Sequence, residues 1–175
     1  YQEQNFPLKY LKSLLLGLSK KLNQIILTKG KIMGTRSLTI VKESLSQELV
    51  VIYKQTDGYP EGMGMKLANF LEGYKIINGI PPDPDPKSAN GMHDLAAQLV
   101  AEFTNGIGEI YLHPSGTRDV WEEFIYYIYL GPDNILRIQV VQACRIKDNQ
   151  SGEWNIVEDK IFDGTPTEVK KWILG

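Results

Sequence analysis

The sequence has few of the side chains from which metal and redox sites are built. Its 175 residues include one cysteine, Cys144, and two histidines, His93 and His113. A single cysteine excludes a disulfide framework and a cysteine-based zinc site, and two histidines exclude a histidine-rich metal site. A long hydrophobic run is also missing from residues 1–32, where the longest apolar stretch, 14–18, is far shorter than the roughly 20 residues that span a bilayer. We therefore expect no metal and no transmembrane segment.

The signature motifs of common cofactor and nucleophile sites are missing as well. No glycine-rich dinucleotide motif joins a strand to a helix, and no P-loop, HExxH, CxxC or GxSxG occurs. Basic and acidic residues nearly balance, with 19 Lys and Arg against 21 Asp and Glu and a net charge of −2. This balance argues against generic nucleic-acid binding. We expect no bound cofactor, and a non-catalytic protein is favoured over an enzyme.

The charge is unevenly distributed along the chain. Residues 1–32 carry six lysines and one acid, a net charge of +5, whereas residues 33–175 carry 13 basic and 20 acidic residues, a net charge of −7. In the basic segment, apolar residues recur at alternating spacings of three and four: Leu8, Leu11, Leu15, Leu18, Leu22 and Ile25. This heptad pattern predicts an amphipathic helix over about 8–27. Such a helix can dock on the domain, dock on another subunit or lie on an anionic membrane surface.

Another interpretation is that residues 1–32 are not native coding sequence. The chain begins with Tyr1, and Met33 opens a segment that resembles a translation start. Codons for residues 29–31 can form a purine run of the kind that precedes bacterial start codons. On this interpretation, the working protein is a single α+β domain over 33–175. N-terminal mass spectrometry of protein made from the native gene distinguishes the two, because a product that starts at Met33 lacks the extension.

The rest of the chain alternates between strand-like and helix-like patterns. Alternating apolar residues and β-branched runs predict strands at 35–42, 49–55, 108–113, 122–130, 135–146 and 154–162. Apolar periodicity and a capping box predict helices at 63–71, 91–104 and 165–174. A Pro-rich segment, 81–86, is predicted to be a surface loop. Together these elements indicate an α+β fold. It has a mostly antiparallel sheet of about six strands with two or three helices packed on one face, plus the N-terminal amphipathic helix.

Polar residues near the predicted strand and helix ends are the candidates for a ligand-binding site: Arg36, Gln55, Asp57, Tyr59, Asn90 and Gln98. Arg36 begins the first strand and Gln55 ends its hairpin partner, so both are expected at the same end of the sheet. The loop at 57–64 leads from there to a helix N-terminus, a natural position for an anion. Asn90 stands at the start of the second helix, where it either caps the helix or contacts a ligand. Gln98 lies on the inward stripe of that helix, where it either braces a loop or contacts a ligand.

Other reactive side chains have simpler structural interpretations. His113 ends a strand, but no serine or cysteine stands at a recognisable spacing from it, which disfavours a general base. His93 belongs to the first turn of a helix. Cys144 lies inside a strand and is interpreted as a core thiol. Glu122 and Glu123 point to opposite faces of a strand, so they do not form a paired acid and base.

Five parts of the chain carry a recognisable combination of short motifs. They are Met33-Gly34-Thr35-Arg36-Ser37-Leu38-Thr39, Tyr53-Lys54-Gln55-Thr56-Asp57-Gly58-Tyr59-Pro60, Ala89-Asn90-Gly91 with Leu95-Ala96-Ala97-Gln98-Leu99-Val100-Ala101, Tyr111-Leu112-His113-Pro114, and Phe162-Asp163-Gly164-Thr165-Pro166. In this order they resemble a family of uncharacterised proteins encoded by bacteriophages and bacteria, over essentially 33–175. The resemblance implies a phage or mobile-element protein in the cytoplasm of a bacterial host, and it implies no activity. Many members of that family carry His in place of Met63 and Glu102, which implies that neither residue is an obligatory metal ligand or base.

Two functional hypotheses follow from these observations. The first is a non-catalytic binding protein of phage or mobile-element type, which holds a small anionic ligand or a host protein and can form a homo-oligomer. The second is a small hydrolase or nucleotide-processing enzyme that uses Asp57 or His113. Because the domain is acidic, a phosphate site in it must depend on Arg36 and on helix dipoles rather than on overall charge.

Overall fold

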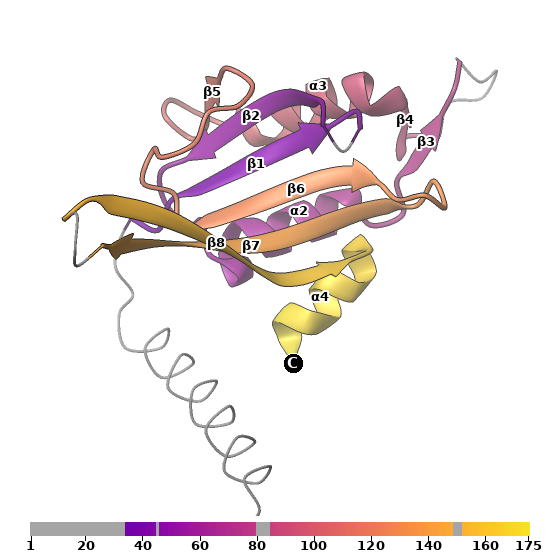
Figure 1. The fold of residues 1–175 in the computed structure, drawn as a ribbon. Helices are drawn as coiled ribbons and strands as arrows, with labels where there is room; N and C mark the ends of the chain where they lie inside the picture. Colours follow the sequence, from indigo (N-terminus) through magenta and orange to yellow (C-terminus); the bar gives the residue numbers. More distant parts are fainter. Residues whose placement is uncertain (1–33, 45, 80–84, 149–151) are drawn as a thin grey trace, which may run out of the picture. The chain divides into compact units, whose positions relative to one another are not determined.

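A six-stranded sheet forms the centre of the fold, with its strands in the order β5-β2-β1-β6-β7-β8 (Figure 1). The strands are β1 (Ser37–Lys42), β2 (Glu48–Lys54), β5 (Tyr111–His113), β6 (Phe124–Leu130), β7 (Leu136–Lys147) and β8 (Trp154–Gly164). The structure, a computed structural model, describes residues 34–44, 46–79, 85–148 and 152–175. The helix predicted at 8–27 and most of the loop predicted at 81–86 lie outside the described residues.

Four of the five strand pairings in this sheet are antiparallel, which confirms the predicted sheet. β1 and β2 form the predicted hairpin, with Ile40 opposite Val51. The fifth pairing is parallel and joins β1 to β6, with Ser37 opposite Phe124. The sequence did not predict this pairing. β5 adds to the outer edge of β2, so the chain must cross the sheet before β6 begins.

Three helices pack their apolar side chains against one face of the sheet, as predicted: α2 (Met65–Leu71), α3 (Gly91–Phe103) and α4 (Pro166–Leu174). α4 begins at the predicted capping box, where the Thr165 hydroxyl accepts the N–H of Glu168 and the Glu168 carboxylate accepts the N–H of Thr165. Two short strands, β3 (Lys75–Ile77) and β4 (Ser88–Asn90), form a separate parallel pair between α2 and α3 in the chain.

The opposite face of the sheet is crossed by residues 114–123, a segment without regular structure that links β5 to β6 and that we call the strap. At one end, the Gly116 N–H donates to the Glu48 carboxylate over 2.8 Å. At the other end, the Glu123 N–H donates to the Arg36 carbonyl over 2.9 Å. Glu48 and Arg36 flank opposite ends of the β1–β2 hairpin, so the strap runs the length of these strands. This face also has a buried apolar cluster, which includes Leu38, Ile40, Val51, Ile125 and Tyr127.

One buried carboxylate fixes the conformation of the strap. The Glu122 side chain is 1% exposed and accepts the N–H groups of Asp119 and Val120 over 2.9 and 2.8 Å. Asp119 and Trp121 have φ angles of 58° and 68°, in the left-handed region that residues other than glycine rarely adopt. The interpretation of Glu122 as a strand residue was wrong, because β6 begins only at Phe124.

Cys144 is exposed, so its interpretation as a core thiol was also wrong. β6 pairs with β7 only as far as Gln142. Beyond that residue, β7 and β8 continue as a two-stranded ribbon in which Cys144 pairs with Val157. The sequence pattern of a strand does not reveal where its neighbour ends, and therefore does not reveal where burial ends.

Candidate functional site

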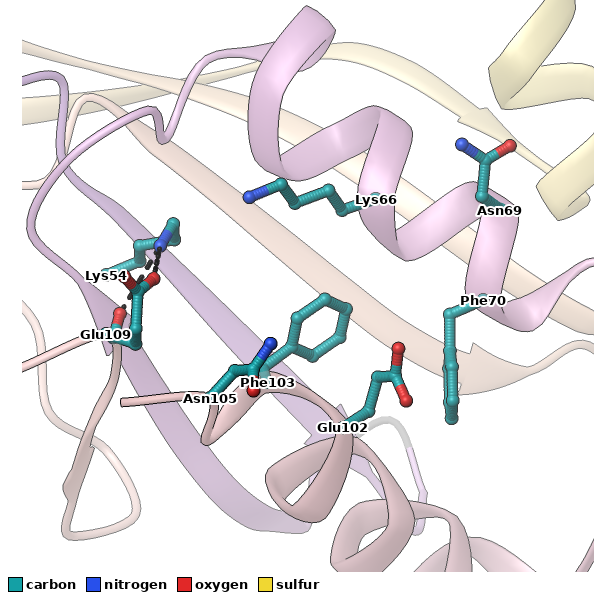
Figure 2. A pocket seen from close by; sticks show the side chains of 8 residues that line it. All are labelled: Lys54, Lys66, Asn69, Phe70, Glu102, Phe103, Asn105 and Glu109. Atoms are coloured by element: carbon teal, nitrogen blue, oxygen red, sulfur yellow. Dashed lines mark hydrogen bonds and ion pairs between the residues drawn. The ribbon is translucent and has the colours of Figure 1, made fainter. Parts of the chain in front are cut away.

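An open cavity of about 620 Å³ lies between α2 and α3, beside the end of β2 (Figure 2). Its volume is within the range of roughly 300–1,000 Å³ that is usual for sites of small ligands. The residues that line it are Lys54, Lys66, Asn69, Phe70, Glu102, Phe103, Asn105 and Glu109. Half of them carry a charge. Because most ligand sites are mainly apolar, this lining favours a charged ligand.

The walls of the cavity come from two helices. In α2, Lys66, Asn69 and Phe70 are three and four residues apart, which places them on one side of the helix. Glu102 and Phe103 belong to the last turn of α3. The rings of Phe70 and Phe103 meet edge to face, with centroids 6.0 Å apart and an angle of 61° between their planes. This contact joins the two helices beside the cavity.

Lys54 is a nearly buried cation in the cavity wall, with 7% of its side chain exposed. It is in phase with Ile52 on β2 and therefore points to the face that the helices cover. Its ammonium lies 3.0 Å from Oε2 of Glu109 and 3.4 Å from the Glu109 carbonyl oxygen. The hydrogen bond and the charge of Lys54, helped by the charge of Lys66, lower the pKa of Glu109. Glu109 is therefore ionised at neutral pH, and its contact with Lys54 links β2 to the segment before β5.

Two further charges in the cavity, Lys66 and Glu102, form no ion pair or hydrogen bond with any described residue. Figure 2 shows Lys66 extending toward the Lys54–Glu109 pair, and Glu102 on the other side of the Phe103 ring. The pKa shifts agree with this placement. Lys66 contributes to the low pKa of Glu109, whereas burial and the charges of Glu102 and Asp94 raise the pKa of Tyr74. The cavity thus has opposite charges on its two sides.

Four of the six residues predicted from the sequence lie close together at one end of the sheet. The register of β1 and β2 places Arg36 beside Gln55, as predicted. Asp57 follows with a φ of 55°, and its carboxylate accepts the Tyr59 hydroxyl over 3.3 Å. The Arg36 guanidinium has no hydrogen-bond or ion-pair partner within the described part of the chain. None of these four residues lines the cavity.

The helix N-terminus after this group offers few free backbone donors to an anion. The N–H groups of Gly62, Met63 and Gly64 donate to carbonyl oxygens of the same loop over 2.9 to 3.5 Å. These bonds build a π-helical turn, Pro60–Gly64 (η1), which continues into α2. Its first residue is a proline and has no N–H to offer. Three of the backbone donors on which an anion site would depend are therefore already used.

The glycines of the same loop are required by close packing. A Cβ atom on Gly58 would lie 2.7 Å from the backbone of Arg36, and one on Gly62 would lie 2.3 Å from the Asp57 carbonyl oxygen. The buried Tyr126 hydroxyl donates to the Gly58 carbonyl over 2.8 Å. Gly58 and Gly62 are therefore required by the way the chain turns against β1.

Asn90 and Gln98 belong to a hydrogen-bond network at the start of α3. Asn90 is the N-cap residue of α3, as predicted, but its side chain accepts the Gly79 N–H over 2.8 Å and makes no cap bond to the helix. The Asn90 N–H instead donates to Asp94 over 2.8 Å. Gln98 accepts the Tyr74 hydroxyl over 2.8 Å and donates to Asp94 over 3.1 Å. Gln98 thus braces a loop, which is one of its two predicted roles.

The six predicted residues form two separate groups rather than one site. His93, in the first turn of α3, lies 3.5 Å from Glu43, which follows the last residue of β1. The start of α3, with Asn90, is therefore at the opposite end of β1 from Arg36. Sequence reasoning missed the cavity. The one available signal was Lys54, a lysine in phase with the apolar residues of its strand.

Other kinds of site receive little support. Within the described residues, no three His, Cys, Asp or Glu side chains gather in a way that can hold a metal ion. In the same ranges, no helix is both long and apolar enough to cross a bilayer. The His113 ring contacts Tyr53 edge to face, with centroids 5.6 Å apart, and has no serine or cysteine hydrogen-bonded to it in the part of the chain that the structure describes. His113 therefore does not supply the enzyme hypothesis with a general base bonded to a nucleophile.

No known family model, curated protein or solved structure matches the chain. The resemblance to phage and bacterial proteins that the short motifs indicate therefore stays a prediction. The function has to be inferred from the cavity, its charges and its surroundings.

Proposed function

We propose that this protein is a non-catalytic binding protein that holds a small anionic ligand in the cavity between α2 and α3. The observation that carries the proposal is the position of Lys54, a nearly buried ammonium in the cavity wall. An ammonium has three N–H donors. Lys54 directs two of them at Glu109, which leaves the third for an oxygen atom of a ligand. Lys66 adds a second cation on the same side of the cavity (Figure 2).

The surroundings of Lys54 strengthen its attraction for an anion. Charges interact more strongly where water is excluded, and the Lys54 side chain is almost fully enclosed. Its partner Glu109 is half exposed, so its carboxylate can be solvated while an anion approaches the ammonium. A hydrogen bond that involves a charged group contributes about 1.5–3 kcal/mol. Two such bonds, from Lys54 and Lys66, contribute about 3–6 kcal/mol, so contacts with the rest of the ligand must supply the remaining free energy that offsets the entropy of association.

The lining of the cavity favours binding over catalysis. None of its eight residues is a serine, threonine, cysteine, histidine or tyrosine, so the lining offers no hydroxyl or thiol nucleophile and no imidazole base. Of its two carboxylates, Glu109 is already paired with Lys54. The groups that remain are suited to holding and orienting a ligand.

The cellular setting in this proposal comes from the sequence motifs. They imply a phage or mobile-element protein in the cytoplasm of a bacterial host. A host protein is the alternative partner, and one observation favours it. The Trp121 and Trp154 side chains are 66% and 65% exposed, and tryptophan is the side chain most enriched at the energetic centres of protein interfaces.

Isothermal titration calorimetry tests the small-ligand proposal. The probes are benzoate, inorganic phosphate, GMP and 4-(aminomethyl)benzoate, and the variant is Lys66→Gln. Lys171→Gln is the matched control, because Lys171 is an exposed lysine of α4 outside the cavity lining. We expect at least one probe to bind, and Lys66→Gln to weaken it about tenfold while Lys171→Gln changes nothing. The proposal is refuted if no probe binds, or if the two variants bind equally well.

A further inference from the structure

The charges of the cavity are arranged in a way that a simple anion does not satisfy. At one wall the charge of Glu109 offsets that of Lys54, whose third N–H stays available to a ligand oxygen. The two charges left over are Lys66 and Glu102, which are of opposite sign and come from different helices. No ion pair within 4.0 Å joins them, and neither pairs with another described residue. A ligand with a single negative charge leaves Glu102 without a partner and is repelled by it.

The two unpaired charges have an apolar surface between them. Figure 2 shows the Phe103 ring between the side that holds Lys66 and the side that holds Glu102, and the Phe70 ring contacts it edge to face. Aromatic rings pack against planar or apolar groups, and their faces attract cations. From one side to the other, the cavity therefore offers a cation, an aromatic surface and an anion. The side chains of Asn69 and Asn105 supply neutral hydrogen-bonding groups in its lining.

We infer that the cavity selects a ligand with two poles: an oxyanion bound by Lys54 and Lys66, and an N–H group, charged or neutral, that donates to Glu102. A planar or apolar body joins the poles and lies against Phe103. This inference rests on the proposed function, since it describes the specificity of the same cavity. Glu102 acts as the specificity residue, because its carboxylate accepts hydrogen bonds from a ligand with N–H donors and repels a ligand that carries only negative charge.

Two sources of ligand share this chemistry. One is an aminocarboxylate, whose ammonium ion pairs with Glu102. The other is a guanine nucleotide, whose phosphate meets the lysines and whose base presents two N–H groups to the carboxylate. Each source has a close analogue that lacks the relevant N–H groups. 4-Ethylbenzoate has a methyl group where 4-(aminomethyl)benzoate has its ammonium, and AMP has no N–H at the position of the guanine N1–H and no 2-amino group.

The test measures the dissociation constants of both pairs by calorimetry for three proteins. Wild type is compared with Glu102→Gln, which removes the charge and keeps the shape. Glu123→Gln is the matched control, because Glu123 is an exposed glutamate outside the cavity lining. We expect wild type and Glu123→Gln to prefer the N–H-bearing member of at least one pair by about tenfold or more. In Glu102→Gln, we expect this preference to fall to about twofold or less, while the affinity for the analogue stays the same or rises.

The outcomes separate this inference from the proposal on which it rests. If no compound binds, the proposed function itself fails. If both members of each pair bind wild type with equal affinity, the anion site stands and the two-pole inference is overturned. If Glu102→Gln keeps the preference for the N–H-bearing compound, the two-pole inference is also overturned, because another group must then accept the ligand's N–H. Because Glu102 is exposed and makes no bond to any described residue, its variant is expected to unfold at the wild-type temperature.

Discussion

Replacement of Glu122 by glutamine tests whether one carboxylate holds the strap in place. Its two oxygen atoms accept the N–H groups of Asp119 and Val120, and Oε2 lies 3.7 Å from the Arg145 guanidinium. A glutamine side chain has the same shape but only one acceptor atom. Its NH₂ group must therefore face one of the two backbone donors. The residues that these bonds support include Asp119, whose φ of 58° is unfavourable without such support.

The expected cost follows from the bonds that are lost. A hydrogen bond to a charged group contributes about 1.5–3 kcal/mol, and a buried N–H left without an acceptor costs about 1–3 kcal/mol. Since these terms overlap, we expect Glu122→Gln to lower the free energy of unfolding by about 2–4 kcal/mol. Glu123→Gln is the matched control. It removes the same charge from the neighbouring residue, whose side chain is exposed. It should therefore change the free energy of unfolding by no more than about 0.5 kcal/mol.

Urea unfolding followed by circular dichroism measures the difference. For a domain of this size, the slope of the free energy against urea is about 2 kcal/mol per molar, so the midpoint of Glu122→Gln should fall by about 1–2 M. The slope itself should not change. If the midpoints of Glu122→Gln and Glu123→Gln agree within error, the strap is held by its other contacts, and the role assigned to Glu122 is wrong.

Three further predictions concern other parts of the fold. Gly58→Ala should lower the free energy of unfolding by about 1–3 kcal/mol in the same assay, because the new Cβ meets backbone that cannot move aside, and a smaller loss would mean that the loop can shift. Thr165→Ala should cost about 1 kcal/mol by removing the cap of α4, whereas Thr165→Ser should keep most of the stability, and equal losses would show that the hydroxyl is not the cap. Burial raises the pKa of Glu48, but hydrogen bonds from Arg118 and the Gly116 N–H outweigh it and hold the pKa below its usual 4.5. A folded-state pKa below the unfolded value stabilises the fold above about pH 4.5 and loses this effect as the pH falls through the folded pKa. The difference in unfolding free energy between wild type and Glu48→Gln should therefore be smaller at pH 3 than at pH 7, and a constant difference would contradict the pKa assignment.

The sequence was a good guide to the elements whose signals are local. Alternation in β1, β2 and β6, the apolar stripe of α3 and the capping box at Thr165 each depend on residues that are neighbours in the chain. The parallel pairing of β1 with β6 has no such signal, because Ser37 and Phe124 are partners only after the strap has crossed the sheet. The exposed position of Cys144 has no local signal either, because the pattern of β7 does not show that β6 pairs with it only as far as Gln142.

The candidate site shows the same limit more strongly. Arg36, Gln55 and Asp57 were correctly placed together because they flank one hairpin. The cavity, in contrast, is a space left between α2 and α3 above the end of β2, and its shape depends on how far apart these helices pack. Lys54 alone carried a signal, since a lysine in phase with Ile52 must be either paired or functional when the helices cover that face.

The central position of β1 has a consequence for the order in which the chain can fold. β1 pairs with β2, which follows it directly in the chain. Its other edge pairs with β6, which is synthesised only after α2 and α3. During synthesis from the N-terminus, the β1–β2 hairpin therefore leaves the ribosome with an open edge and with Leu38 and Ile40 uncovered. Pairings this distant in the sequence slow folding, and an uncovered edge invites association with other chains. The strap thus closes the molecule at a late step. Before that step, the growing chain most needs a chaperone or a low concentration to prevent association with other chains.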